Sequence, residues 1–401
     1  MLGLSRRDTL AVGIICVAQM CMTLSSFIVQ WNEVLMEQAC SIRNLTFPST
    51  ECNENAGAQH EASLREGWMA LAVAWPNFLT ISIISAAADW IGRKPAIIAS
   101  LLGQAVFTSC IWLLPLSGEL CIGHNCIENY WVVLAITAVG SLTGGSPVTL
   151  AVMFAVLGDV SIGMSAKART RMYVVLEVFQ WIGATAGPLS GVFVAEHFGG
   201  LRAAFGFYTS CLLLSAFLVS WCPETLTSER AVSFSFCRAT PVANLRPFVQ
   251  HPVLIRFAIT WGPPLCLGGA FISSTGNLYL MDVGNFTMLD LAELATATTL
   301  CGTVALAVGL PLQQACGMGT RAIIVTAYWL GSLSTISWAV LQLVHGHQGL
   351  IRAVVYTAAV ASADVHVLAP VIRSLLTSIS LSGEVDVPVA SMLGSVPPLL
   401  H

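Results

Sequence analysis

The sequence predicts an all-α membrane protein built from ten transmembrane helices. The first observation is composition: of 401 residues, 56% are apolar and only 9% are charged, and the mean hydropathy is +0.78. A soluble domain carries about 25% charged residues, because charge is what its surface presents to water. The second observation is that long apolar segments recur along the whole chain. Together they exclude a nucleic-acid-binding protein, a disordered protein and a soluble enzyme.

Ten apolar segments reach the length of about 20 residues that a helix needs to cross the hydrocarbon core. The first is preceded by Arg6 and Arg7, as a signal peptide would be. It is longer than the apolar region of a signal peptide and lacks a small-residue cleavage site, so we expect a retained helix. The predicted spans are 10–36, 67–88, 96–117, 131–158, 172–195, 204–221, 252–279, 291–312, 322–343 and 350–371.

The distribution of basic residues predicts a cytoplasmic N-terminus. With that orientation thirteen of the 17 Lys and Arg residues lie inside, and only Arg43, Arg65, Arg202 and Arg352 lie outside. The two N-x-S/T acceptors, at Asn44 and Asn285, then both fall on the outer side, where glycosylation occurs. We expect a multi-pass protein of the plasma membrane or of an endolysosomal or vacuolar membrane.

Four of the thirteen cysteines fall in the first two outer loops. Cys40 with Cys52, and Cys121 with Cys126, could each close a small loop on an oxidising side of the membrane, or could remain unpaired. The other nine lie in or beside helices, where Cys behaves as a small apolar residue. No His/Cys spacing suggests a metal site, and no cofactor is expected.

The predicted spans fall into two groups. Residues 1–221 form a six-helix bundle, 222–251 form a cytoplasmic central loop, and 252–401 form an incomplete second bundle of four helices plus the start of a fifth. The apolar stretch after Pro388 is too short to cross a bilayer, so the last two helices of a six-plus-six arrangement are missing. A natural truncation and an incomplete gene model both explain this.

The second predicted span ends in A-A-A-D-W-I-G-R-K-P. Asp89, Gly92, Arg93 and Lys94 place an acid and two cations around a tight turn, so the acid can exchange partners between conformations. This stretch resembles the D-x-x-G-R-R/K signature of the major facilitator superfamily, with Ser85 in place of a glycine. The resemblance implies a two-bundle fold with a gating motif at these four residues; the alternative is an ordinary charged loop.

The fifth predicted span carries a stripe of small residues. Gly183, Gly187 and Gly191 repeat every four residues, which allows close approach of another helix, and Pro188 removes a backbone hydrogen bond. The segment resembles the G-x-x-x-G-P-x-x-G motif of antiporters in the same superfamily. As a packing stripe it bears on architecture more than on the direction of transport.

Three further segments resemble the proton-coupled folate transporter and thymic stromal cotransporter family. They are G-D-V at 158–160 with A-R-T-R-M and L-E after it, P-V-I-R-S at 370–374, and P-E-T-L at 223–226. The resemblance implies a proton-coupled symporter of organic solutes. It also implies that Asp159, Glu177 and Arg373 occupy positions used for coupling or substrate.

The residues themselves give a partly independent argument. At 1.5 Å per residue, Glu177 lies about 9 Å past Arg171 and Asp364 about 13 Å from Arg373, inside the hydrocarbon region. His366 and Arg373, seven residues apart, share a helix face, and Asp364 points away. Ionisable groups at such depth are costly and mark candidate functional sites, although each could be a satisfied structural group. A His and carboxylates there can exchange protons.

We therefore predict a secondary transporter that moves a small organic solute by alternating access, with protons as the coupling ion. The interior is poor in cations, which disfavours a polyanion such as a folate and favours a less charged solute. The alternatives are a proton-driven exporter and a non-transporting, receptor-like or truncated membrane protein. Aromatic side chains available to the solute are Trp75, Trp181, Tyr208, Trp261, Tyr279 and Trp329.

Overall fold

The fold is described from a computed structural model. The structure describes residues 5–28, 31–45, 49–53, 55–114, 119–122, 125–227, 231–236, 239–240, 255, 279–281, 284–344, 347–368 and 370–374. The predicted span 252–279, most of the central loop and the apolar stretch after Pro388 lie largely outside these residues. The division into bundles at 221 and 251 therefore stays a prediction.

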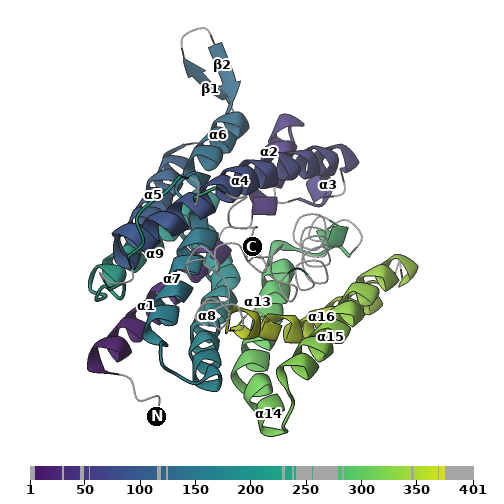
Figure 1. Ribbon diagram of the computed structural model, residues 1–401. Coiled ribbons are helices and arrows are strands. Elements are labelled where there is room, and N and C mark those ends of the chain that lie inside the picture. Colours follow the sequence, from purple (N-terminus) through teal and green to yellow (C-terminus); the bar gives the residue numbers. More distant parts are fainter. Residues whose placement is uncertain are drawn as a thin grey trace.

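The first half of the chain crosses the molecule with six helical segments, one of which is broken (Figure 1). Two short helices and a small hairpin connect them on one side, and in Figure 1 the hairpin projects beyond the end of α6. The long elements are α1 (Arg6–Ile28), α4 (Ala56–Ile91), α5 (Arg93–Leu113), α6 (Asn129–Ser141) with α7 (Gly145–Val160), α8 (Ala166–Phe198) and α9 (Leu201–Ser220). The connecting elements are α2 (Trp31–Ile42), α3 (Thr50–Asn53), β1 (Glu119–Ile122) and β2 (Asn125–Glu128).

The described part of the second half contains three helical spans, each with an irregular segment. In the first, α13 (Met288–Val304) passes through the π-helical turn η2 (Ala305–Gly309) into α14 (Leu310–Ala315). In the second, α15 (Thr320–Val340) ends in the 3₁₀ turn η3 (Leu341–Val344). In the third, α16 (Gln348–Ser362) continues as the 3₁₀ segment η4 (Ala363–Val367).

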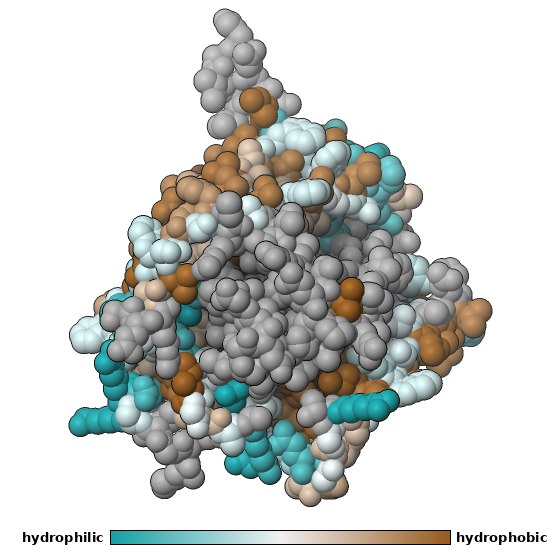
Figure 2. All heavy atoms as spheres, in the orientation of Figure 1, coloured by the Kyte–Doolittle hydropathy of each residue, from teal (hydrophilic) through white to brown (hydrophobic). Residues whose placement is uncertain are grey.

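Eight helical stretches among the described residues are long and apolar enough to cross a bilayer, judged by length and composition. They coincide with predicted spans, and α15 covers the ninth predicted span without being one of the eight. Much of the surface that these helices present is hydrophobic (Figure 2). The stretches are Arg6–Ile28, Ala56–Ile91, Arg93–Leu113, Asn129–Val160, Lys167–Phe198, Leu201–Ser220, Leu289–Ala315 and Gln348–Ser374.

Two predicted spans differ from the observed helices. The first was expected to run to residue 36, but α1 ends at Ile28 and a separate helix begins at Trp31. The fourth was expected as one helix, but it is broken between Ser141 and Gly145. Gly144, with φ 99°, adopts the left-handed conformation that interrupts the helix there. Hydropathy averaged over the length of a span does not show such short breaks.

Helix ends of the first half gather at two opposite ends of the bundle. At one, here called the Arg93 end, Arg93 Nε lies 3.0 Å from Asp159 Oδ2, and Arg7 Nη2 donates to the Glu224 carbonyl at 2.9 Å. At the other, the Cys40 end, Arg65 Nη2 lies 2.6 Å from Glu128 Oε1. This up-and-down arrangement is the one that the alternating predicted loops require.

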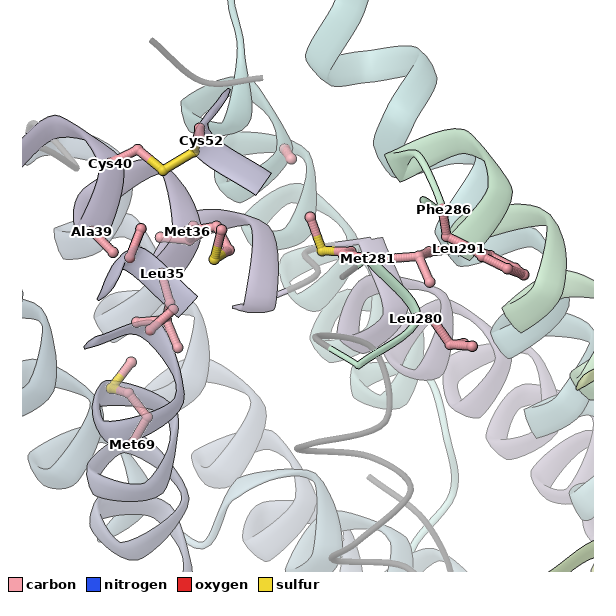
Figure 3. Packing of buried hydrophobic residues seen from close by; sticks show 14 of the residues in the cluster. Leu35, Met36, Ala39, Cys40, Cys52, Met69, Leu280, Met281, Phe286 and Leu291 are labelled. Carbon is pink, nitrogen blue, oxygen red and sulfur yellow. A yellow bond between two sulfur atoms is a disulfide. The ribbon is translucent and has the colours of Figure 1, made fainter. Parts of the chain in front are cut away.

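The Cys40 end is closed by a disulfide and a hydrophobic cluster (Figure 3). The Cys40–Cys52 bond, one of the two pairings considered from the sequence, ties α2 to α3. Leu35 and Met36 of α2 belong to the same cluster as Met281 and Phe286, which precede α13. The strand register pairs the Cα atoms of Cys121 and Cys126, whose side chains lie outside what the structure describes.

Packing of α8 connects the two halves. One side of α8 packs along α1, and another packs along α13 and η2 (Figure 1). The two halves of the chain therefore meet along α8, and the buried polar residues on this helix lie between them.

Candidate functional site

Asp89, Arg93 and Asp159 form one buried charge cluster at the Arg93 end. The Arg93 guanidinium forms an ion pair with Asp89, four residues before it, and another with Asp159 at the end of α7. All three side chains are at most 7% exposed. The two carboxylates thus pair the Arg93 guanidinium from two sides at this helix junction. Asp159, predicted as a coupling or substrate residue together with Glu177, lies in this cluster, whereas Glu177 pairs with Arg373.

Glu224 completes this cluster from the end of the sixth helical segment. Its carboxylate accepts hydrogen bonds from the backbone N–H groups of Arg93 at 3.0 Å and Lys94 at 3.1 Å. It thereby caps the N-terminus of α5, where orphan N–H groups and the helix dipole favour an anion. Gly92 has φ 118°, and a Cβ there would overlap the Glu224 carboxylate. The sequence places Glu224 only within the P-E-T-L segment and does not predict that it caps a helix. The one indication of such a role is that Glu224 is an acid predicted on the same side of the membrane as Arg93.

Glu177 and Arg373 form a second buried cluster, between the two halves of the chain. They make an ion pair that joins α8 to the end of the Gln348–Ser374 span, with side chains 2% and 6% exposed. The Arg373 guanidinium also lies 4.0 Å from the ring centroid of Phe154 on α7. Beside the pair, the hydroxyls of Thr170 and Ser374 are 2.8 Å apart.

His366 lies on the same side of its span as Arg373, as the spacing of seven predicts. Its ring contacts that of Trp181 on α8, with centroids 3.9 Å apart and planes at 53°. Trp181 is one helical turn from Glu177, so the ion pair and the ring pair form two successive layers between the same two helices. His366 and Trp181 are 3% and 4% exposed. Sequence reasoning noted Trp181 only as one aromatic residue among several.

The two irregular helical segments of the second half meet at this place. The π turn η2 and the 3₁₀ segment η4 pack against each other, and η2 also packs on α8. Pro311 follows η2 and Pro370 lies four residues after His366, so in each case a backbone donor of a regular helix is missing. Irregular turns inside helices often mark hinges or functional sites. The side chain of Asp364, within η4, lies outside the described part of the chain.

The small-residue stripe of α8 faces away from this site, toward α1. A Cβ at Gly183 would meet the Met20 backbone, and a Cβ at Gly191 would overlap the Ile28 carbonyl oxygen. Gly187 lies between them against Leu24, and Pro188 lies inside α8. These residues thus fix α8 closely to α1 while its other face meets the second half.

Two aromatic residues that the sequence makes available to the solute are exposed in the structure. Trp75 on α4 is 58% exposed and Trp329 on α15 is 70% exposed. A helix that faces lipid is apolar there as well as inside, so the sequence pattern does not separate the two faces. Asn44 and Asn285 are exposed, each at positive φ. Trp261 lies outside the described residues.

No protein-family model and no curated protein matches this sequence. Solved structures do match it along nearly the whole chain. The human organic anion transporter MFSD10 (TETRAN) is 16% identical with a TM-score of 0.60, covering 98% of this chain and 97% of that one. The D-xylose-proton symporter is 12% identical with a TM-score of 0.59, covering 97% and 87%. The xylose transporter XylE from E. coli is 10% identical with a TM-score of 0.57, covering 98% and 95%.

The chain has the major facilitator fold. Its eight candidate spans and this fold identify an integral, multi-pass membrane protein. Glu177 with Arg373, and Trp181 with His366, are two contacts that join the two halves of this chain.

Proposed function

We propose that this chain is a secondary transporter that moves a small organic solute by alternating access, coupled to protons. The fold supports transport, and the observation that carries the proposal is the buried Glu177–Arg373 ion pair between the halves. Such a pair is costly to bury and costly to break, so the two residues are expected to be either fully paired or fully separated. In this proposal the pair holds α8 against the Gln348–Ser374 span until it separates.

Protonation of Glu177 provides the coupling step in this proposal. A neutral Glu177 no longer holds Arg373 by charge, so α8 and the Gln348–Ser374 span can separate. When the proton leaves, the ion pair forms again and the layer closes. A pH difference of one unit corresponds to about 1.4 kcal/mol, which drives about tenfold accumulation per coupled proton.

We further propose that the solute is small and carries no net charge. Three of the four buried arginines in the described spans, Arg65, Arg93 and Arg373, are paired with carboxylates of the chain itself. An anionic solute would have to displace one of these acids or remain unpaired at low dielectric, which is expensive. Of the two kinds of solute in the names of the structural neighbours, an organic anion and D-xylose, the uncharged kind fits better.

Reconstitution into liposomes tests the proposal. We expect saturable uptake that follows an imposed inward proton gradient and that Glu177→Gln or Asp364→Asn suppresses. Glu196→Gln, a change of an exposed acid at the other end of α8, is the matched control and should leave uptake unchanged. Uptake by Glu177→Gln and Asp364→Asn vesicles with the same rate and pH dependence as the unmodified protein would reject proton coupling through these residues.

Proton-driven export is the second candidate, and the glycine–proline motif of α8 favours it because it resembles an antiporter motif. The two directions are separated by imposing the proton gradient both ways across vesicles of known orientation. If the protein is a proton-driven exporter, protons and solute should move in opposite directions. If it does not transport, adding solute should cause no proton movement with the gradient in either direction.

The proposed orientation has a cytoplasmic N-terminus in a plasma, endolysosomal or vacuolar membrane, with Asn44 and Asn285 on the outer side. Both side chains are exposed, so an oligosaccharide meets no packing obstacle at either. A loss of apparent mass on treatment with a peptide-N-glycosidase, abolished by Asn44→Gln with Asn285→Gln, tests this orientation.

A further inference from the structure

Three buried nitrogen atoms at the interface between α8 and η4 have no hydrogen-bond partner within the described part of the chain. They are Trp181 Nε1 and both ring nitrogens of His366. These side chains are 4% and 3% exposed. Buried polar atoms in folded proteins are nearly always hydrogen-bonded, and an unpaired one is expensive. Three such atoms on two touching rings are therefore available to hydrogen-bond a partner that the described residues do not supply.

The surroundings of the two rings are apolar and closely packed. Ala184, Leu306 and Val367 belong to the same buried cluster as Trp181, and a Cβ at Gly302 would overlap the His366 ring. One helical turn from Trp181 and two from His366, Glu177 and Arg373 form an ion pair with each other. The rings thus offer hydrogen bonds next to two described charges that compensate each other.

We propose that Trp181 and His366 bind the transported solute, and that this solute is uncharged and carries hydroxyl groups. This rests on the proposed transport function and names its substrate class. The indole N–H is a donor only, whereas a neutral imidazole has one donor and one acceptor. A hydroxyl group both donates and accepts, so it satisfies either side chain. An ion would leave its own charge unpaired beside these groups.

The ring contact limits where the solute can bind. With ring centroids 3.9 Å apart, nothing fits between the two faces, so the solute must contact the ring edges, where the nitrogen atoms lie. Separation of α8 from the Gln348–Ser374 span would move the two rings apart. Binding and opening of this layer are therefore linked.

Equilibrium dialysis of the purified full chain in detergent tests the site without requiring transport. The probes are radiolabelled D-xylose and myo-inositol, which are uncharged and hydroxylated, and D-xylonate, which matches xylose in size but is an anion. The unmodified protein should bind at least one uncharged probe saturably and D-xylonate at least tenfold more weakly. Absence of saturable binding of both uncharged probes, or equal binding of D-xylonate, overturns the proposal.

Variants assign the binding to the two rings. Trp181→Phe keeps an aromatic ring but removes the N–H, and should weaken binding of the uncharged probe about tenfold, the value of one hydrogen bond. His366→Phe should weaken it at least as much, and His366→Gln, which retains a donor and an acceptor, should restore part of it. Trp329→Phe and His197→Phe are the matched controls, because both residues are exposed elsewhere.

Several results separate this proposal from the transport function. Unchanged binding in both Trp181→Phe and His366→Phe overturns the site, even if vesicles made from the same protein transport the probe. Selective loss of binding in both variants supports the site, even if no vesicle shows flux. If a variant fails to elute as a single species on gel filtration, binding by Trp181→Tyr and His366→Asn decides in the same way.

Discussion

Glu177 and Arg373, 196 residues apart in the chain, form a buried ion pair that joins the two halves of the molecule. Phe154 covers the guanidinium, and the hydroxyl pair of Thr170 and Ser374 lies beside it. Every one of these contacts links α7 or α8 with the end of the Gln348–Ser374 span. In this structure the two halves are therefore closed against each other at this level.

Removing one member of the pair should destabilise the protein more than removing both. Glu177→Leu leaves Arg373 buried without its partner, and we expect a loss of about 3–5 kcal/mol, whereas Glu177→Leu with Arg373→Met should cost much less. Unfolding in mixed detergent micelles measures both. Arg352→Met, which breaks an ion pair with Asp290 whose Arg side chain is 49% exposed, should cost less than about 1 kcal/mol. A double variant as unstable as Glu177→Leu would contradict this account.

A reversible cross-link between Thr170 and Ser374 should stop transport. Their hydroxyl oxygens are 2.8 Å apart, so cysteines at both positions can form a disulfide between α8 and the Gln348–Ser374 span. If this layer must open, oxidation should abolish solute exchange in vesicles and a reducing agent should restore it. Each single cysteine variant controls for oxidation of the native thiols. Exchange at full rate while cross-linked would show that the layer does not open during transport.

The sequence predicts where most of the spans lie and which ionisable residues lie deep within them. It does not predict which side chains those residues contact. The spacing of His366 and Arg373 places them on one helix face, and both contact α8 in the structure. Their partners on α8, Trp181 and Glu177, are nearly 200 residues away, and local pattern carries no information on such pairing. Asp159, predicted together with them as a coupling or substrate residue, forms an ion pair with Arg93, and the local pattern carries no information on that partner either.

Other features could not be predicted because apolar helices hide them. The break at Gly144 and the irregular turns η2 and η4 lie inside spans whose average hydropathy is that of a continuous transmembrane helix. The sequence also does not separate exposed aromatic residues such as Trp75 from buried ones such as Trp181, because lipid and protein interior favour the same side chains. The charged motif around Arg93 was predictable, since charges are rare enough in this chain for each one to be informative.

Adding a methyl group to the glycine stripe of α8 should destabilise the first bundle. A Cβ at Gly191 would overlap the carbonyl oxygen of Ile28 on α1, which is backbone and cannot rotate away. We expect Gly191→Ala to cost about 1–3 kcal/mol, the usual cost of overpacking. Gly13→Ala is the matched control, because nothing lies within 4 Å of a Cβ there. Equal thermal stability of the two variants would show that α1 and α8 can move apart without cost.

Glu224 should contribute to stability as a helix cap. Glu224→Ala removes the acceptor of the Arg93 and Lys94 backbone N–H groups, and loss of such a cap costs about 1 kcal/mol. Thermal unfolding in detergent measures the change, and Glu196→Ala, an exposed acid on α8, is the control. Glu224→Gln, which keeps an acceptor oxygen but not the charge, should lose less. If Glu224→Ala lowers the thermal stability no more than Glu196→Ala does, water must replace the Glu224 carboxylate as the acceptor for these N–H groups.

Glu37, on α2 outside the candidate spans, should make stability fall as the pH rises. Burial raises the pKa of this half-buried carboxyl above its ordinary value of 4.5. Between those two values the folded chain keeps a proton that the unfolded chain has lost, so folding becomes less favourable with each increment of pH. Glu37→Gln removes the titrating group. Its stability relative to the unmodified protein should therefore rise from pH 4.5 to the raised pKa and then stay constant.

Melting temperatures measured from about pH 4 to pH 8 give this difference directly. Glu51→Gln on α3 makes the same change at an exposed acid and is the control variant. A difference for Glu37→Gln that stays flat, or falls as the pH rises, would show that Glu37 is ionised in the folded chain.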